Sequence, residues 1–304
     1  MQTDQISMID NLIQLIEENI REELDLDVLA EKSGFSKYYI HRLFKSLTGH
    51  TLMTYVRGRR LSLSLNELIN TNLNIIDIAQ EYHFSHEQSY IRAFKQQFQV
   101  TPAHYRRMNC EMPVVEKLDT ARLYEMNQGV MMAPNMCIIP KFYLQGIERE
   151  IIHDHNYYHQ DSNHLVEEWA KTYFPQVKNR VDATVYYGLV QYNDNPNGRL
   201  YAACTQVESP CDIKEPIKNY TIPTYNYASF HYVGMHSPYE INFRTVLALY
   251  EKINEWKKET SYIQAAGFHI ERVDLKKCDE AYCEMDIYVP VYSKTGLDKL
   301  ENRG

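Results

Sequence analysis

The sequence predicts a multidomain protein with an all-α N-terminal domain of two tandem helix-turn-helix motifs (residues 1–108) and an α+β C-terminal domain (residues 109–304). Three observations predict this fold class. A stretch of about fifty residues occurs twice in the N-terminal third, which indicates a structural repeat. The basic residues concentrate in the repeated section. After Met108 the helical periodicity gives way to alternating strand-like and helix-like segments.

The repeat aligns residues 24–55 with residues 73–105. The same residue type recurs in order, with one single-residue slip, at Ala30 and Ala79, Phe35 and Phe84, Ser36 and Ser85, Arg42 and Arg92, Phe44 and Phe94, Thr51 and Thr101, and Tyr55 and Tyr105. A small residue in a first helix, a turn and a capped second helix are typical of the helix-turn-helix. Two such motifs in tandem are therefore expected.

Composition favours a globular protein with charge concentrated in one section. The chain has 304 residues and 44% hydrophobic residues, which is enough for two cores. Its net charge is −8, yet residues 32–108 hold eleven basic and four acidic residues. Such a positive section in an acidic chain suits contact with phosphates. The alternative is a basic surface that is merely solvated.

Several classes of protein and site are not expected. No apolar run is long enough to span a bilayer and the polar start is no signal peptide, so we expect a cytoplasmic protein without membrane partners. The six cysteines lack CxxC spacing and are expected to be mostly small buried residues rather than a redox switch. We expect no cofactor and no metal, although His153, His155, His159 and His164 fall in one loop-like run.

The first motif can be followed element by element. An apolar face between Met8 and Ile20 predicts the opening helix. Gly34 suits a turn that needs positive φ, and Ser36 is expected to cap the second helix. The core side of that helix is predicted to hold Ile40, Leu43, Phe44 and Leu47, and its outer side to hold Lys37, Tyr38, His41, Arg42 and Lys45.

The second motif differs at its turn, where His83 replaces the glycine. A non-glycine residue at positive φ costs on the order of 1 kcal/mol. Ser85 is expected to form a capping box with Gln88. The outer side of the second reading helix is predicted to hold Glu87, Gln88, Ser89, Arg92 and Lys95.

One helix from Leu52 to Ile69 is expected to join the motifs. Its length is about 27 Å at 1.5 Å per residue, and successive major grooves on one side of duplex DNA lie about 34 Å apart. A single chain is therefore expected to place both reading helices in neighbouring grooves. Gly58 inside this helix costs about 1 kcal/mol relative to alanine, and the sequence offers no reason for it.

These motifs resemble the DNA-binding domain of the AraC/XylS transcription regulators over residues 7–107. The resemblance rests on LAEKSGFSKYYIHRLFKSLTG in the first motif and IIDIAQEYHFSHEQSYIRAFKQQFQVTPAHYR in the second. It implies double-stranded DNA and RNA polymerase as partners. It also implies that bases are read by Tyr38, His41 and Arg42 in the first motif, and by Gln88, Ser89 and Arg92 in the second. A contact to phosphate is the alternative for each. Further DNA contacts are expected from Ser36, Lys37, Lys45, Ser85 and Lys95.

The C-terminal half is expected to contain two units of strand–helix–strand–strand. Strands are predicted at residues 141–150, 184–192, 199–208, 226–234, 268–273 and 281–291, and helices at residues 164–174 and 241–258. Residues 109–128 are expected to form a linker and the first pieces of the domain. An α+β domain with pseudo-twofold symmetry follows from this order.

Tyrosines and carboxylates in this half suggest a ligand pocket. Nineteen of the 25 tyrosines follow residue 108, and tyrosine combines apolar area with a polar tip. The expected effector-binding residues are Glu271, Glu284, Tyr187, Tyr232, Trp169, Phe268 and Tyr282. The alternative is that tyrosines fill the core and both glutamates are solvated on an open sheet face.

This half resembles the GyrI-like effector-binding domains, which Rob-type members of the AraC family also carry. The matching segments are GIE near residue 146, YYGL at 186–189, YASFHYVG, HIERV and CEMDIYVPV. The resemblance implies a lipophilic cationic ligand and a pocket glutamate from a Glu-x-Tyr strand. Glu271 takes that position, with Val273 in place of the tyrosine.

The favoured hypothesis is a transcription regulator that is not an enzyme and whose activity responds to a small organic effector. A second hypothesis makes the C-terminal half a hydrolase with Glu271 or Glu284 as general base. A third treats it as a sequestering or protein-interaction module. Turnover that Glu→Gln abolishes distinguishes the second hypothesis, and ligand-induced stabilisation distinguishes the first.

Overall fold

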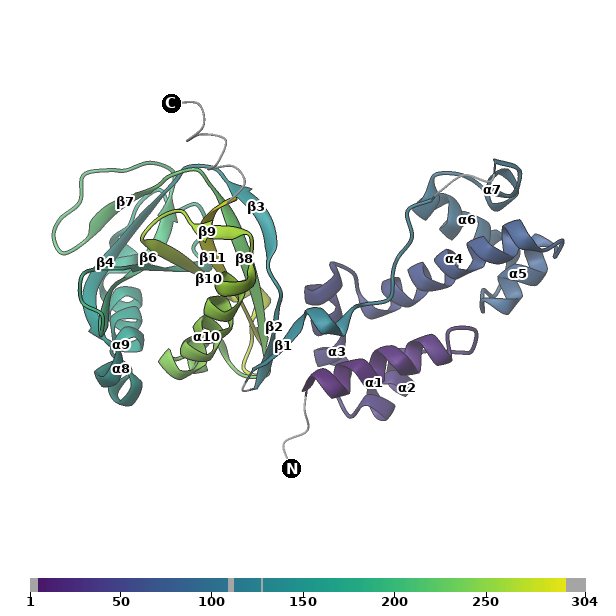
Figure 1. Cartoon of the computed structure of the whole chain (residues 1–304), viewed down its shortest axis with the longest axis horizontal. Coiled ribbons are helices and arrows are strands. Elements are labelled where there is room, and N and C mark those ends of the chain that lie inside the picture. Colours follow the sequence, from purple (N-terminus) through teal and green to yellow (C-terminus); the bar gives the residue numbers. More distant parts are fainter. Residues whose placement is uncertain (1–4, 109–111, 127, 294–304) are drawn as a thin grey trace. The chain divides into compact units, whose positions relative to one another are not determined.

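A computed structural model describes residues 5–108, 112–126 and 128–293 of the chain (Figure 1). It divides into two compact units, residues 1–121 and residues 122–304. Each unit has its own hydrophobic core and is described by itself. The assignment of residues 109–121 to a domain stays a prediction.

The first unit is helical. Its helices are α1 (Gln5–Glu18), α2 (Leu26–Ser33), α3 (Lys37–Thr48), α4 (Leu52–Asn70), α5 (Ile75–Glu81), α6 (Glu87–Phe98) and α7 (Pro102–Met108). The long helix α4 joins the two motifs (Figure 1). At its start the Tyr55 ring packs against Phe44 of α3, with ring centroids 5.3 Å apart. Further along, Ser64 Oγ lies 2.8 Å from the Tyr90 hydroxyl of α6.

The predicted core of the first motif is confirmed: Ile40, Leu43, Phe44 and Leu47 are all buried. The second motif has an equivalent core. It consists of Leu61, Leu65, Leu68, Ile78, Ala79, Tyr82, Tyr90, Phe94, Phe98 and Tyr105. The apolar spacing of three and four residues therefore selected the buried faces of both reading helices.

The caps of the two reading helices differ by one residue. Ser36 caps α3 as predicted, and its hydroxyl accepts the Tyr39 backbone N–H at 3.2 Å. The prediction that Ser85 caps α6 is wrong, because the N-cap is His86. The His86 backbone N–H donates to Ser89 Oγ at 3.3 Å. The single-residue slip between the repeats falls at this point, so the inserted residue moves the cap along the chain.

Both turns of the second motif use non-glycine residues at positive φ. Gly34 and Gly49 have φ of 77° and 75° in the first motif. His83 and Gln99 occupy the equivalent places with φ of 57° and 63°. The missing turn glycine thus leaves the backbone shape unchanged and adds strain, since side chains disfavour this region.

Residues 112–121 pack along α4 and explain Gly58. The backbone N–H of Val115 donates to Ser62 Oγ at 2.9 Å, and the Arg59 guanidinium donates to the Val115 carbonyl at 2.7 Å. A Cβ at Gly58 would lie 2.9 Å from Val115 Cγ2. The glycine therefore allows this segment to lie close to the helix.

The second unit is built on one antiparallel sheet. Within the described residues its strands are β1 (Leu123–Met126), β2 (Gly129–Met132), β3 (Asn135–Ile139), β4 (Phe142–Ile152), β5 (Val185–Gln191), β6 (Gly198–Val207), β7 (Lys218–Ile222), β8 (Tyr225–Gly234), β9 (Tyr262–Gln264), β10 (Phe268–Asp274) and β11 (Cys283–Ser293). The order is β1-β2-β8-β11-β10-β5-β6-β4-β7, with β3 on β8 and β9 on β11. The predicted fold class is confirmed, because β4, β5 and β6 form one repeat and β8, β10 and β11 the other.

Helices connect the strands of each repeat. They are α8 (His153–His159), α9 (Asp161–Glu168) and α10 (Phe243–Glu259), with a π-helical turn at Trp169–Tyr173 continuing α9. The expectation that the histidine-rich run is a loop is wrong, because it forms α8 and the start of α9. Asn156 is buried there and accepts the Ser162 backbone N–H at 2.9 Å. A buried polar contact stabilises this segment, and hydrophobic periodicity does not detect such contacts.

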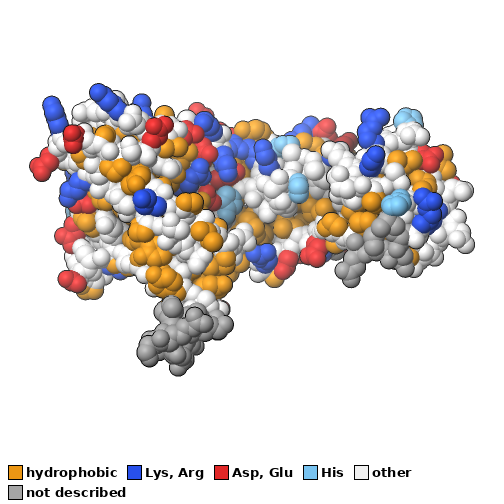
Figure 2. Space-filling view, turned by 90° about the horizontal axis from the view of Figure 1, so that it is seen from above, with side chains coloured by type: hydrophobic (Ala, Val, Ile, Leu, Met, Phe, Trp, Pro, Cys, Tyr) orange, Lys and Arg blue, Asp and Glu red, His pale blue; other side chains and the backbone are white. Residues whose placement is uncertain are grey.

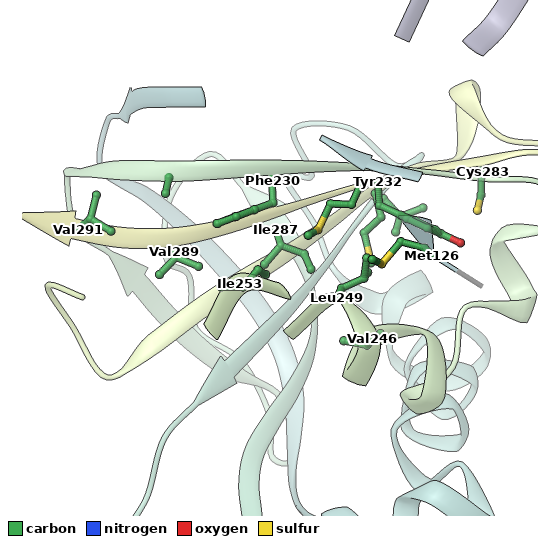
Figure 3. Packing of buried hydrophobic residues seen from close by; sticks show 14 residues of the cluster. Met126, Phe230, Tyr232, Val246, Leu249, Ile253, Cys283, Ile287, Val289 and Val291 are labelled. Carbon is green, nitrogen blue, oxygen red and sulfur yellow. The ribbon is translucent and has the colours of Figure 1, made fainter. Parts of the chain in front are cut away.

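The main core of this unit lies between α10 and the strands β8 and β11. Figure 3 shows Phe230, Ile287 and Val289 beside Leu249 and Ile253 of α10. All five side chains are at most 2% exposed. This packing fixes α10 over one face of the sheet.

Two further expectations concern helices and cysteines. No helix among the described residues has the length and hydropathy required to cross a bilayer. Cys204 and Cys283 are buried, whereas Cys137, Cys211 and Cys278 are partly exposed. Cys110 lies outside the described residues. Burial raises the pKa of the Cys204 and Cys283 thiols.

Candidate functional site

The outer face of α3 is exposed as the sequence predicted. Tyr38 is 62% exposed, and its hydroxyl accepts a hydrogen bond from Arg42 at 3.0 Å. The Arg42 guanidinium also lies over the Tyr38 ring, 5.2 Å from its centroid. Lys37 forms an ion pair with Asp27 of α2. None of the predicted DNA-contacting residues on this helix is buried: Ser36, Lys37, Tyr38, His41, Arg42 and Lys45.

The outer face of α6 is more open. Glu87 is partly exposed, whereas the predicted DNA-contacting residues here are all exposed: Ser85, Gln88, Ser89, Arg92 and Lys95. Ser89 takes part in the helix cap through its bond to the His86 carbonyl at 2.6 Å. Figure 2 shows lysine and arginine side chains, with histidines among them, over the helical unit. Cations on two exposed helices form a surface suited to phosphates and base edges.

The second unit contains a cavity of about 690 Å³. Small-molecule sites measure about 300–1,000 Å³. Its walls come from α9, α10 and one face of β5, β6, β10 and β11, and they include Trp169, Tyr186, Tyr201, Leu247, Tyr250, His269 and Glu271. Apolar walls with a few convergent polar groups are typical of ligand sites.

Glu271 is the buried carboxylate of this cavity, at 6% exposure. One carboxylate oxygen accepts the Tyr250 hydroxyl, and the other accepts the Tyr201 hydroxyl at 3.2 Å. Burial raises the pKa of Glu271, and the two tyrosine hydrogen bonds offset part of that rise. Among the described residues no cation forms an ion pair with Glu271, so hydrogen bonds alone stabilise its ionised form.

The tyrosines of this network are themselves held by neighbours. His269 Nε2 lies 2.6 Å from the Tyr250 hydroxyl, and its Nδ1 lies 2.9 Å from the Tyr192 hydroxyl. Burial lowers the pKa of His269 to about 3, so the ring is neutral. Because Tyr250 donates to Glu271, it accepts from His269 Nε2–H, and Nδ1 then accepts from Tyr192. The chain of donors ends on the carboxylate.

Comparisons with known proteins fit both units. The family model for a "Helix-turn-helix domain" matches residues 29–108. The family model for a "GyrI-like small molecule binding domain" matches residues 132–292. Regulatory protein SoxS of Escherichia coli K12 is 43% identical over 99 residues, which cover 33% of this chain and 92% of SoxS. The chain belongs to the AraC-type regulators that carry a GyrI-like domain.

Similarity to a longer AraC-type relative covers about a third of each chain. Transcriptional regulator Rob of Salmonella typhimurium is 45% identical over 104 residues, which cover 34% of this chain and 36% of Rob. The chain thus matches about a third of Rob's length. A solved structure, the C-terminal domain of the response regulator yesN from Fusobacterium nucleatum, is 32% identical, with a TM-score of 0.31 and coverage of 32% of this chain and 97% of that domain. None of these descriptions names an enzyme.

The structure brings only some of the expected effector residues to the GyrI-like cavity. Glu271 and Trp169 line it. Tyr187 and Phe268 instead belong to a separate hydrophobic cluster. Side chains alternate across a strand, so each of these two points away from the face that carries Tyr186 or His269.

The remaining expected residues also lie elsewhere. Glu284 forms an ion pair with Lys277 at 3.2 Å and accepts the Tyr282 hydroxyl at 2.9 Å. Tyr232 is fully buried in the core, and its hydroxyl lies 2.8 Å from His236 Nε2. Glu284, Tyr282 and Tyr232 therefore do not line the cavity.

Several cavity residues were absent from the sequence-based expectation. Tyr201, Tyr250 and His269 surround Glu271, and Arg199 and Lys257 line the cavity nearby. His269 was detectable, because it lies two residues before Glu271 on the same strand face. Tyr250 recurs at helical spacing with apolar residues of α10, and this pattern does not reveal that its hydroxyl bonds to Glu271.

Proposed function

We propose that this protein is a transcription regulator that binds duplex DNA through α3 and α6 and binds a small organic effector in the GyrI-like cavity. The repeated, exposed and cation-bearing faces of α3 and α6 are the observation that carries the DNA-binding part. Membership in the AraC-type family supports it. RNA polymerase is a further proposed partner, because a transcription regulator acts on its activity.

The length of α4 supports binding by a single chain. Its 19 residues correspond to about 28 Å at 1.5 Å per residue. One reading helix packs near each end of α4, and successive major grooves lie about 34 Å apart. The two helices therefore reach neighbouring grooves on one side of a duplex without a second copy of the chain.

A mobility-shift titration tests the readers. Duplexes selected from a random library by the wild-type chain serve as the cognate DNA, and random duplexes as the competitor. Arg42→Ala and Arg92→Ala are each expected to cost about 1–3 kcal/mol of discrimination, as the loss of a bidentate base contact does. Arg149→Ala, which removes an exposed arginine of the second unit, is the control. Unchanged discrimination in both test variants contradicts the proposed readers.

The buried glutamate in an aromatic cavity supports the effector part. A thermal-shift screen of the full chain with small organic molecules tests it, because a ligand that binds only the folded state raises the unfolding temperature. Leu247→Trp, which fills part of the cavity, is expected to abolish the shift. Stabilisation that survives this substitution places binding outside the cavity and contradicts the proposal.

A further inference from the structure

The charged side chains that line the cavity differ in whether an oppositely charged group or a hydrogen-bond donor compensates them. Four side chains of the lining are fully charged types: Glu167, Glu271, Arg199 and Lys257. Glu167 is exposed and pairs with Lys171 at 3.0 Å. Glu271 accepts hydrogen bonds from two tyrosines. Among the described residues, neither Arg199 nor Lys257 forms an ion pair with a carboxylate, and neither has an acidic hydrogen-bond partner.

Lys257 of α10 is half-buried without an acidic partner. Its ammonium donates to Gln264 Oε1 at 2.7 Å. In the described part of the chain, no carboxylate oxygen lies within 4.0 Å of the Lys257 ammonium nitrogen, the distance that defines an ion pair. Burial lowers the pKa of Lys257. An ammonium in this setting gains by meeting an anion.

Arg199 at the start of β6 is in a similar position. Its guanidinium carbon lies 5.2 Å from the centroid of the Tyr192 ring. One nitrogen, Nη1, donates to the carbonyls of Asn195 and Gly198 at 3.2 and 2.6 Å. Among the described residues no carboxylate forms an ion pair with it. Guanidinium has five N–H donors, so several remain for a ligand.

Both cations belong to the same end of the cavity. Burial lowers the pKa of His269 most, and the positive charges of Lys257 and Arg199 lower it further. The Tyr192 ring lies under Arg199, and its hydroxyl lies 2.9 Å from His269 Nδ1; Gln264, which accepts from Lys257, donates to the Phe268 carbonyl at 3.2 Å. Both cations therefore lie on the His269 side of the cavity lining, which also carries Glu271.

We propose that the effector is an apolar molecule with a single carboxylate or similar monoanionic group, which Arg199 and Lys257 bind. This inference rests on the proposed effector function and departs from the cationic ligand that Glu271 suggested. Glu271 accepts hydrogen bonds from Tyr201 and Tyr250, whereas Arg199 and Lys257 have only neutral acceptors among the described residues. Arginine and lysine provide charge-assisted donors that hold an anion in a partly buried site.

Three probes with one apolar body test the inference on the full chain. They are biphenyl-4-carboxylate, its neutral carboxamide, and biphenyl-4-methylammonium, with Kd measured by isothermal titration calorimetry. The carboxylate is expected to bind about tenfold to a hundredfold more tightly than the carboxamide, as hydrogen bonds to charged groups give. The ammonium is expected to bind most weakly.

Lys257→Met and Arg199→Met locate the effect. Each is expected to reduce the preference for carboxylate over carboxamide about tenfold and to leave carboxamide binding unchanged, which also reports that the cavity is folded. Lys258→Met, an exposed neighbour outside the cavity lining, is the matched control and keeps the preference.

The outcomes separate the inference from the proposed function. Equal Kd values for carboxylate and carboxamide, both lost in Leu247→Trp, overturn the anionic ligand while leaving a binding cavity. Tightest binding of the ammonium, lost in Glu271→Gln, overturns it in favour of a cationic ligand. No binding by any probe, together with an empty screen, overturns the effector function itself.

Discussion

Gly188 of β5 is the position where one added methyl group tests the architecture of the cavity. A Cβ there would lie 2.6 Å from Glu271 Oε2 and 2.7 Å from the Tyr201 hydroxyl oxygen. Both atoms belong to the hydrogen bond that Tyr201 donates to Glu271. Gly188→Ala therefore either separates this pair or displaces the strand.

The expected cost combines two effects. Overpacking a filled interior costs about 1–3 kcal/mol. Loss of a hydrogen bond to a buried charged group costs about 1.5–3 kcal/mol. Because relief of the clash can itself break the bond, the two overlap, and we expect Gly188→Ala to lower the free energy of unfolding by about 2–4 kcal/mol.

Urea denaturation followed by tryptophan fluorescence measures this loss. Both tryptophans of the chain, Trp169 and Trp256, lie in the second unit, so fluorescence reports that unit alone. Gly267→Ala is the control, because a Cβ at Gly267 meets no atom within 4 Å. In a Glu271→Ala background the cost of Gly188→Ala should fall, since the nearest atom is gone. Equal midpoints for Gly188→Ala and Gly267→Ala would refute the described geometry.

Three further predictions concern stability. His83→Gly and Gln99→Gly should each raise the free energy of unfolding of the helical unit by about 0.5–1 kcal/mol, because relief of positive-φ strain exceeds the added chain entropy. Denaturation followed by far-ultraviolet circular dichroism measures this change, and a loss of stability contradicts the prediction. Gly58→Ala should destabilise the same unit by about 1 kcal/mol, since its clash with Val115 outweighs the gain in helix propensity, and Val115→Ala should restore stability. Glu271→Gln should stabilise the second unit by about 1–3 kcal/mol at pH 8. Burial raises the Glu271 pKa above 4.5, so wild-type stability falls as the pH rises and the advantage of glutamine shrinks toward pH 4.5; a pH-independent difference contradicts this.

The helical unit was largely predictable because its signals are local. Apolar spacing selected the buried faces, and Leu52–Asn70 forms the expected connecting helix. The prediction of an N-cap at Ser85 was wrong, because the alignment of the repeats does not determine whether the inserted residue lies before or after the N-cap. Gly58 had no explanation in the sequence, because its neighbour Val115 is distant along the chain and only the fold brings them together.

The cavity was less predictable because it depends on which strand face turns inward. Residues 282–289 alternate between two sets of side chains, but the sequence does not determine which set faces α10. The face with Met285, Ile287 and Val289 does so, and the carboxylate of Glu284 therefore lies on the other side. For the same reason Phe268, and not His269, was placed in the expected effector pocket. Long-range pairing, here between β10 and β5, decides such questions.

The cavity around Glu271 carries charged groups that lower the folding stability of the second unit. A buried carboxylate without a cation lowers the stability of the unliganded unit, and neutral His269 adds a cost at acid pH because the unfolded ring binds a proton more readily. Uncompensated Lys257 and Arg199 act in the same direction. A ligand anion that neutralises these cations recovers part of that free energy on binding. Substitutions that neutralise Lys257 or Arg199 should therefore stabilise the free protein and weaken its response to an anionic ligand, whereas surface substitutions should change neither.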